Sequence, residues 1–171
     1  HAFSIRNTLR QERHTLSNEA EQVIAAVGPV VQGPERIYAM LTSSDMPFPT
    51  AVLSTGDEVR LDQTAYSLHR ASRNREDRKL VFDSFWSAWK AYETTLGQAL
   101  DTQVKVHVFQ AKARRYEGAL EAALSGPNIP TSVYRTLIDA THRHLPSLHR
   151  YFRLRQRMLG LDDLHYYDIY P

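Results

Sequence analysis

The sequence predicts a mainly α-helical protein with long antiparallel helices, a short N-terminal helical region and one small β-hairpin. Three observations support this class. Apolar residues recur at helical spacing through most of the second half, helix-capping residues precede these runs, and only one short segment has the pattern of paired strands. The 171 residues suit one domain or one part of a larger one, and a hydrophobic content of 42% is sufficient to form a core.

The first 44 residues predict several short helices. The first ends before His14, and Ser17 is expected to cap the second by accepting a hydrogen bond from the amide of Ala20. The Gly-Pro pair at 28–29 should end that helix. Pro34 suits the first turn of another helix, because proline lacks only an amide that has no helical partner there.

Residues 51–61 predict the hairpin. Pro47 and Pro49 prevent a helix from continuing into this segment, and two short apolar runs flank a turn that contains Gly56. Because an isolated hairpin is marginally stable in water, we expect it to pack on a helix.

The remainder predicts long helices. Asp62 should cap a short one, and Asn74 should begin a continuous helix over 74–124, roughly 75 Å long at ~1.5 Å per residue. Bends are expected at Gly97 and Gly118, because glycine is a poor helix former. The apolar positions of this run are Val81, Phe85, Trp89, Tyr92, Leu96, Leu100, Val104, Val108 and Ala111.

A second long helix is predicted over 130–159, with a kink at Pro146 and a stop at Gly160. Because only a short turn at 125–128 joins the two long segments, we expect them to pack as an antiparallel pair.

The histidines do not form a metal-binding pattern. His142, His144 and His149 lie two and five residues apart, so they cannot share one helix face, and the sequence contains no H-E-x-x-H, G-x-S-x-G or glycine-rich phosphate loop. The absence of cysteine excludes a disulfide, a thiolate nucleophile and a cysteine zinc site. We therefore predict no catalytic, cofactor-binding or metal-binding residue in this chain.

Basic residues gather in the second half, although the net charge is only +2. They are Lys112, Arg114, Arg115, Arg143, Arg150, Arg153, Arg155 and Arg157. An ion-pair network with nearby acids is the favoured interpretation, and the acids are Glu117, Glu121, Asp139, Asp162 and Asp163. The alternative is a phosphate-binding or acid-binding face whose affinity falls with salt. No apolar run is long enough for a membrane span, so no membrane partner is expected.

Two aromatic groups have different expected roles. The first has helical spacing and predicts core packing: Phe82, Phe85, Trp86, Trp89 and Tyr92. In the second, Asp168 stands among Tyr166, Tyr167 and Tyr170 in a segment with an extended pattern. We expect this acid to be hydrogen-bonded by tyrosines or by a partner segment.

Several blocks of the second half resemble the oligoendopeptidase F family. Residues 109–121 (FQAKARRYEGALE) resemble its F-x-A-x-x-R-x-Y-x-x-A-L-E stretch, and residues 129–138 (IPTSVYRTLI) its I-P-x-x-V-Y-x-x-L-I stretch. Residues 145–157 (LPSLHRYFRLRQR) are similar to its L-P-x-L-H-R-Y-x-x-L-R block, and 159–161 with 167–170 (YDIY) follow in order. With less specific similarity at 14–17 and the hairpin, the resemblance covers nearly the whole chain.

The resemblance implies zinc metallopeptidases, relatives of thimet oligopeptidase, that cleave short peptides in an enclosed helical cavity. In that family the H-E-x-x-H helix follows the Y-D-x-Y block, so no catalytic or zinc-binding position is carried over onto this chain. Residues 1–61 would be the end of the N-terminal lobe, and 62–171 the first long helices of the catalytic lobe. The implied partners are the remaining catalytic region and short peptides, with zinc and a cytoplasmic location for the parent protein.

Two functions follow as hypotheses. The first is a non-catalytic part of such a peptidase, inactive alone, that provides scaffold and cavity wall. The second is a self-standing helical binding module whose arginine-rich face meets acidic or nucleic-acid partners. The ordered blocks favour the first, and no nucleic acid is then expected. Because the chain lacks an initial Met and stops after an aromatic run, we expect a piece of a longer protein whose exposed apolar patch could form a homodimer.

Overall fold

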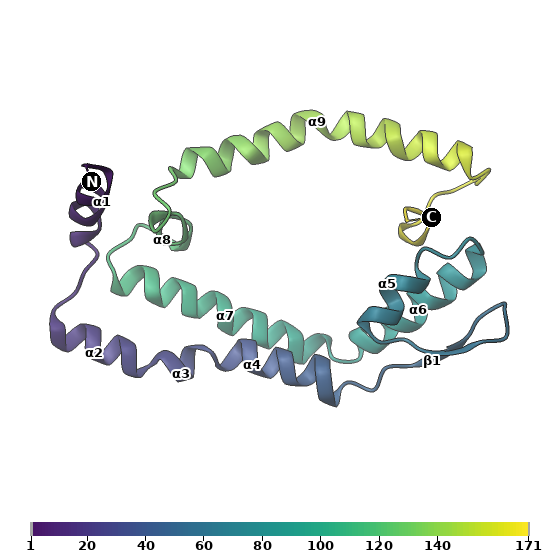
Figure 1. Ribbon diagram of the computed structural model, residues 1–171, viewed down its shortest axis with the longest axis horizontal. Coiled ribbons are helices and arrows are strands. Elements are labelled where there is room, and N and C mark those ends of the chain that lie inside the picture. Colours follow the sequence, from purple (N-terminus) through teal and green to yellow (C-terminus); the bar gives the residue numbers. More distant parts are fainter. Residues whose placement is uncertain (1, 171) are drawn as a thin grey trace. The chain divides into compact units, whose positions relative to one another are not determined.

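The computed structural model describes residues 2–170 and confirms a mainly α fold with one antiparallel hairpin (Figure 1). The N-terminal elements are α1 (Ala2–Glu12), α2 (Asn18–Ala26), α3 (Gly28–Val31), α4 (Gly33–Met40) and a π-helical turn η1 (Leu41–Asp45). The hairpin consists of β1 (Thr50–Val52) and β2 (Glu58–Arg60). There follow α5 (Gln63–His69), α6 (Arg75–Lys90), α7 (Glu93–Ala113), α8 (Ala119–Ser125), α9 (Thr131–Met158) and a 3-10 turn η2 (Tyr166–Asp168).

These elements divide between two compact units. The first contains residues up to Leu41 together with Thr95–His142, and the second contains Thr42–Thr94 together with residues from Arg143 on. Both units therefore combine segments that are distant in the sequence.

The predicted helix starts are confirmed. The Ser17 hydroxyl accepts a hydrogen bond from the Ala20 amide at 3.4 Å, and Pro34 lies in the first turn of α4. Asp62 caps α5 at 2.8 Å, and the Asn74 side chain caps α6 at 2.9 Å. The pair at 28–29 ends α2 as expected, but it also begins α3, because proline is well tolerated at the start of a helix.

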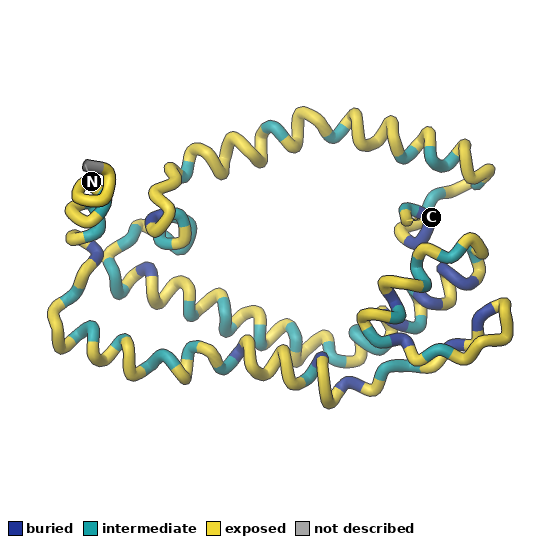
Figure 2. The backbone as a smooth tube through the Cα atoms, viewed as in Figure 1, coloured by how far each residue is buried: buried dark blue, intermediate teal, exposed yellow. Residues whose placement is uncertain are grey.

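The hairpin packs on helices of the second unit, as expected. Thr50 pairs with Arg60 and Val52 with Glu58, and Gly56 makes the turn with a φ of +89°. Asp77 of α6 accepts hydrogen bonds from the amide and the hydroxyl of Ser54, both at 2.7 Å. Beneath the strands lies the core of this unit: Ala51, Leu53, Leu61, Tyr66, Val81 and Phe85. Figure 2 shows this concentration of buried residues around α5, α6 and the hairpin.

The prediction that the aromatic run packs in the core is confirmed only in part, because Phe85 is buried in this core whereas Trp86 is exposed. Phe85 is 3% exposed and stacks on Tyr66 at 4.2 Å. Trp89 is only half-buried at the edge of the core, and Trp86 is exposed but donates its indole N–H to the Tyr66 hydroxyl at 3.1 Å. Phe85, rather than Trp89, is therefore the buried centre of the α6 face.

The single helix predicted over 74–124 is wrong, because the chain forms α6, α7 and α8 in its place. After α6 the Tyr92 amide bonds to the Trp89 carbonyl three residues back, which breaks the regular ladder. At the end of α7, Arg115 adopts a left-handed φ of 61°, a conformation that commonly ends helices. Gly118 caps α8, whereas α7 continues through Gly97 without a break.

α9 has the predicted bounds within one residue, continues through Pro146 and ends before Gly160, whose φ is +64°. None of its residues is buried (Figure 2). The sequence predicts that the two long helical segments pack as an antiparallel pair. Inside each unit of the described chain, α9 makes no extensive contact with α6 or α7, so this closely packed pair is not found there.

Candidate functional site

The most fully buried polar group of the second unit is the Asp168 carboxylate in η2. Its side chain is completely inaccessible to solvent. The His165 amide donates to Oδ2 at 3.0 Å, and the Asp168 amide donates to the His165 carbonyl at 2.9 Å. This reciprocal pair closes the 3-10 turn, so the segment predicted as extended is a capped turn.

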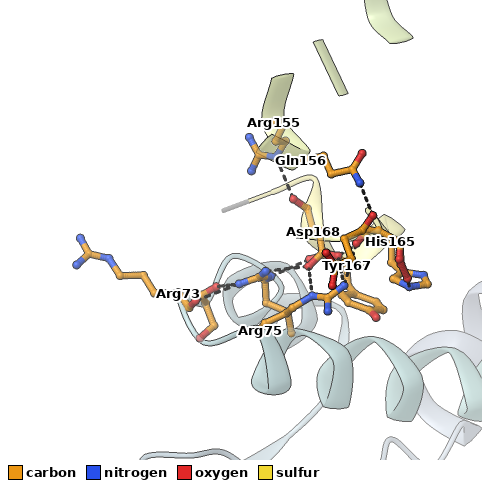
Figure 3. A network of polar contacts seen from close by, with 11 residues as sticks. Arg73, Arg75, Arg155, Gln156, His165, Tyr167 and Asp168 are labelled. Carbon is orange, nitrogen blue, oxygen red and sulfur yellow. Dashed lines mark hydrogen bonds and ion pairs between the residues drawn. The ribbon is translucent and has the colours of Figure 1, made fainter. Parts of the chain in front are cut away.

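Arginines from two helices converge on this residue (Figure 3). Arg75 of α6 donates Nε to Oδ1 at 3.1 Å and Nη2 to Oδ2 at 3.0 Å, a bidentate pair. Arg78, one turn later, donates Nη2 to Oδ1 at 2.9 Å. Arg155 of α9 donates Nε to the Asp168 carbonyl at 2.9 Å. The turn is thus bonded to both α6 and α9.

The buried guanidinium of Arg78 has further partners. It donates Nε to the Tyr167 carbonyl at 2.9 Å, and Nη1 to the carbonyls of Ser72 and Arg73 at 3.0 and 3.1 Å. The Arg78 side chain is 4% exposed. A buried cation with this set of acceptors fixes the backbone on both sides of it.

These contacts determine the charge state of Asp168. Burial favours the neutral acid, but the hydrogen bonds from Arg75, from the His165 amide and from Arg78 outweigh it and hold the pKa of Asp168 to about 2. The hydrogen bond to Asp168 in turn raises the pKa of Arg75. The carboxylate is therefore ionised at neutral pH and has no role as a proton donor there. It anchors the turn to the helices.

The sequence points to Asp168 but not to its partners. Its partner segment is α6 and its ligands are arginines, whereas the Tyr166 and Tyr170 hydroxyls bond to each other at 2.9 Å. One sequence feature was available: Arg75 and Arg78 lie three residues apart in the first turn of α6. Cations are unfavourable near a helix N-terminus, so two of them there indicate a nearby anion.

A second polar network lies in the first unit. Arg114, at the end of α7, donates Nη1 and Nη2 to the two carboxylate oxygens of Glu21 in α2, both at 2.8 Å. The Leu16 amide also donates to Glu21 at 3.1 Å, and the arginine and this amide together lower the pKa of Glu21. This network connects the segment before α2 to the end of α7.

His14, which is 5% exposed, lies beside that ion pair. Its ring stacks on Tyr116 with the centroids 3.6 Å apart. Nδ1 donates to the Arg114 carbonyl at 2.8 Å, and Nε2 accepts from Nε of Arg13 at 2.9 Å. Both ring nitrogens are therefore used within the protein, which leaves neither as a metal ligand.

The other predicted features of α9 lie apart from these networks. His142, His144 and His149 are exposed. No three histidine, aspartate or glutamate residues of the described chain, residues 2–170, come close enough to hold a metal ion.

The predicted arginine network formed only in part. Arg155 bonds to the Asp168 carbonyl and Arg114 to Glu21, and Glu121 pairs with Arg13 at 3.6 Å. The acids expected to neutralise the remaining α9 arginines do not reach them. In the described chain, the side chains of Arg143, Arg150, Arg153 and Arg157 take part in no hydrogen bond or ion pair.

Comparison with known proteins identifies the family. The sequence model of Peptidase family M3 matches residues 68–171, and that of Oligopeptidase F matches residues 1–48. The chain belongs to peptidase family M3. The arginine network around Asp168 and the ion pair of Arg114 are thus features of an M3 chain.

Individual M3 relatives cover almost all of this chain. It is 36% identical over 160 residues to an oligoendopeptidase F homolog of Lactococcus lactis, an alignment that includes 94% of this chain and 27% of that protein. It is 33% identical over 170 residues to oligopeptidase PepF of Bacillus subtilis, which covers 99% of this chain and 25% of the relative. The chain therefore spans about a quarter of the length of these relatives.

A solved structure of an oligoendopeptidase also matches this chain. The crystal structure of oligoendopeptidase-F from Enterococcus faecium matches 98% of this chain and 33% of that chain, with a TM-score of 0.94 and 37% sequence identity. Among residues 2–170, no helix combines the length and the apolar character needed to cross a membrane.

Proposed function

We propose that this chain is a non-catalytic helical part of an oligoendopeptidase F-like zinc metallopeptidase that hydrolyses short peptides. The observation that carries the proposal is the match of 94% of the chain to an oligoendopeptidase F homolog of which it forms only 27%. In this role, residues 1–61 form the end of an N-terminal lobe and 62–171 the first long helices of a catalytic lobe. The proposed location is the cytoplasm.

The contribution of the chain is scaffold and cavity wall. The Asp168 network supports this role, because it joins a C-terminal turn to α6 and α9 through charges that stay ionised at neutral pH. The exposed apolar side of α9 also supports it, since a remaining catalytic region would cover such a face.

The zinc of such an enzyme does not fit this chain alone. The described residues bring no three potential ligands together, and both nitrogens of the buried His14 are already bonded. We therefore assign no metal ligand and no catalytic step to these residues, and propose that zinc is bound by sequence outside them.

A deletion experiment tests the proposal. A longer protein that contains this chain is expected to bind zinc and to cleave a quenched fluorogenic peptide in a chelator-sensitive reaction, and deletion of residues 62–171 should abolish the cleavage. Peptide hydrolysis that survives this deletion would contradict the proposal. So would a longer protein that neither binds zinc nor cleaves any short peptide.

A further inference from the structure

The C-terminal half of α9 and the loop after it form a hollow of about 800 Å3 in the second unit. Its helical lining includes Ser147, Arg150, Leu154 and Arg157, which are spaced by three and four residues and so lie on one face. Leu161 of the following loop completes the wall. The volume lies within the range typical of small-ligand sites, roughly 300–1,000 Å3.

Hydrogen bonds hold the walls of this hollow in place. Gln156 donates Nε2 to the Asp162 carbonyl at 2.6 Å, and the Leu161 amide donates to the Gln156 carbonyl at 3.1 Å, so the loop is bonded to the helix. Arg155 donates Nη1 to the Tyr151 hydroxyl at 3.1 Å and thereby orients that ring. The same arginine is fixed by the Asp168 carbonyl, which connects the hollow to the buried network.

The charge of the hollow is entirely positive. Arg150, Arg153 and Arg157 line it, and no aspartate or glutamate does. Within the described chain none of the three guanidinium groups has a hydrogen-bond or ion-pair partner. Three like charges within two helical turns repel one another, and an anion placed among them removes that repulsion.

The side chains that line the hollow favour the carboxylate groups of a peptide as the bound anion. Planar guanidinium groups bind carboxylates with two parallel hydrogen bonds. Tyr151, Leu154 and Leu161 add apolar surface beside them, which suits the side chains of a peptide. A nucleic acid fits less well, because the whole chain carries 19 acidic residues and a net charge of only +2, without an extended basic stripe.

We propose that this hollow binds short peptides through their carboxylate groups, with apolar side chains of the peptide against Tyr151 and Leu154. The inference rests on the proposed function, because it takes a short peptide substrate as the occupant. It goes beyond that function in naming acidic peptides as the preferred class and α9 as the element that selects them.

The test is a titration of the 171-residue chain with a rhodamine-labelled peptide in which leucine and glutamate alternate, followed by fluorescence anisotropy. The same peptide with glutamine in place of glutamate is the ligand control. We expect the glutamate peptide to bind at least tenfold more tightly, with an affinity that falls as salt rises. Equal binding of the two peptides would overturn the inference.

Variants then locate the binding. The triple substitution Arg150→Gln, Arg153→Gln and Arg157→Gln should remove the preference for the glutamate peptide, with helix content checked by circular dichroism. These side chains are exposed and unpaired, so the fold should not depend on them.

A charge-matched control distinguishes binding at the hollow from attraction by the net charge of the chain. The substitutions Arg6→Gln, Arg135→Gln and Arg143→Gln remove the same three charges from exposed helix positions outside the hollow. This control should bind the glutamate peptide like the parent. If it loses as much affinity as the first variant, the attraction is a property of the whole surface and the inference is wrong.

Two further experiments test whether the occupant is a nucleic acid and whether the inference can fail while the proposed function holds. If a ten-nucleotide single-stranded DNA binds the hollow more tightly than the glutamate peptide, the occupant is a nucleic acid and the inference fails. If the longer protein cleaves neutral peptides with bound zinc while the glutamate peptide does not bind this chain, the inference fails and the proposed function stands.

Discussion

Replacing Asp168 with asparagine should destabilise this protein substantially, because it removes a buried charge and leaves its partners in place. The carboxylate accepts hydrogen bonds from Arg75, from Arg78 and from the His165 amide. An asparagine of the same shape can keep the contact with His165. It cannot neutralise the Arg78 guanidinium, whose side chain is 4% exposed.

The size of the effect follows from two considerations. The network lowers the pKa of Asp168 from 3.8 to about 2, which corresponds to a preference for the ionised form of about 2 kcal/mol. Removing one partner of a buried ion pair costs about 3–5 kcal/mol in other proteins. Because Arg78 keeps three backbone carbonyl acceptors, we expect Asp168→Asn to lower the free energy of unfolding by about 2–4 kcal/mol.

The pH dependence makes this prediction specific. An aspartate with a depressed folded-state pKa contributes stability above the unfolded value of 3.8, and this contribution is lost as the pH falls toward about 2. The difference in stability between the parent and Asp168→Asn should therefore be constant above about pH 5 and shrink between about pH 4 and 2.

Urea unfolding followed by far-ultraviolet circular dichroism measures this difference. Asp163→Asn is the matched control, because that aspartate lies in the same segment but its side chain is 68% exposed. It should change the free energy of unfolding by no more than about 0.5 kcal/mol. The reasoning is refuted if the two variants unfold alike, or if the effect of Asp168→Asn is the same at pH 2.5 as at pH 7.

Three other outcomes are expected. Phe85→Ala should cost about 3–5 kcal/mol of unfolding free energy in the same assay, and the half-buried Trp89→Ala clearly less; the reverse order would show that the assigned core is wrong. The isolated chain should neither retain stoichiometric zinc by elemental analysis after gel filtration nor cleave a quenched fluorogenic peptide, and one tightly bound zinc with chelator-sensitive turnover would contradict this. Because Leu148 and Met158 of α9 are 45% and 77% exposed, the isolated chain should self-associate in light scattering at micromolar concentration; a monomer that binds no hydrophobic dye would exclude it.

Local features of this protein could be predicted from the sequence because they depend on neighbouring residues. Caps at Ser17, Asp62 and Asn74 use hydrogen bonds that span only two or three residues. The hairpin turn needs a residue that tolerates a positive φ, and Gly56 provides it. The family resemblance likewise depends on ordered residues along the chain, and the matches to peptidase family M3 agree with it.

Apolar periodicity could not locate the ends of α6, α7 and α8. The breaks between them are short, and the apolar spacing continues across them. At Arg115 a left-handed conformation ends α7 without a glycine, so no sequence pattern marks it.

The candidate site was decided by the tertiary structure. Asp168 is 93 residues from Arg75, and Glu21 is 93 residues from Arg114, so neither pair follows from spacing in the sequence. An arginine of α9 stays unpaired when no acidic side chain reaches it in space. The acids that lie near these arginines in the sequence do not reach them. The sequence by itself determined the helix caps, the hairpin and the family, because these depend on local chemistry and on residue order. Only the tertiary structure determined which charges meet and are buried, because ion pairing depends on distance in space.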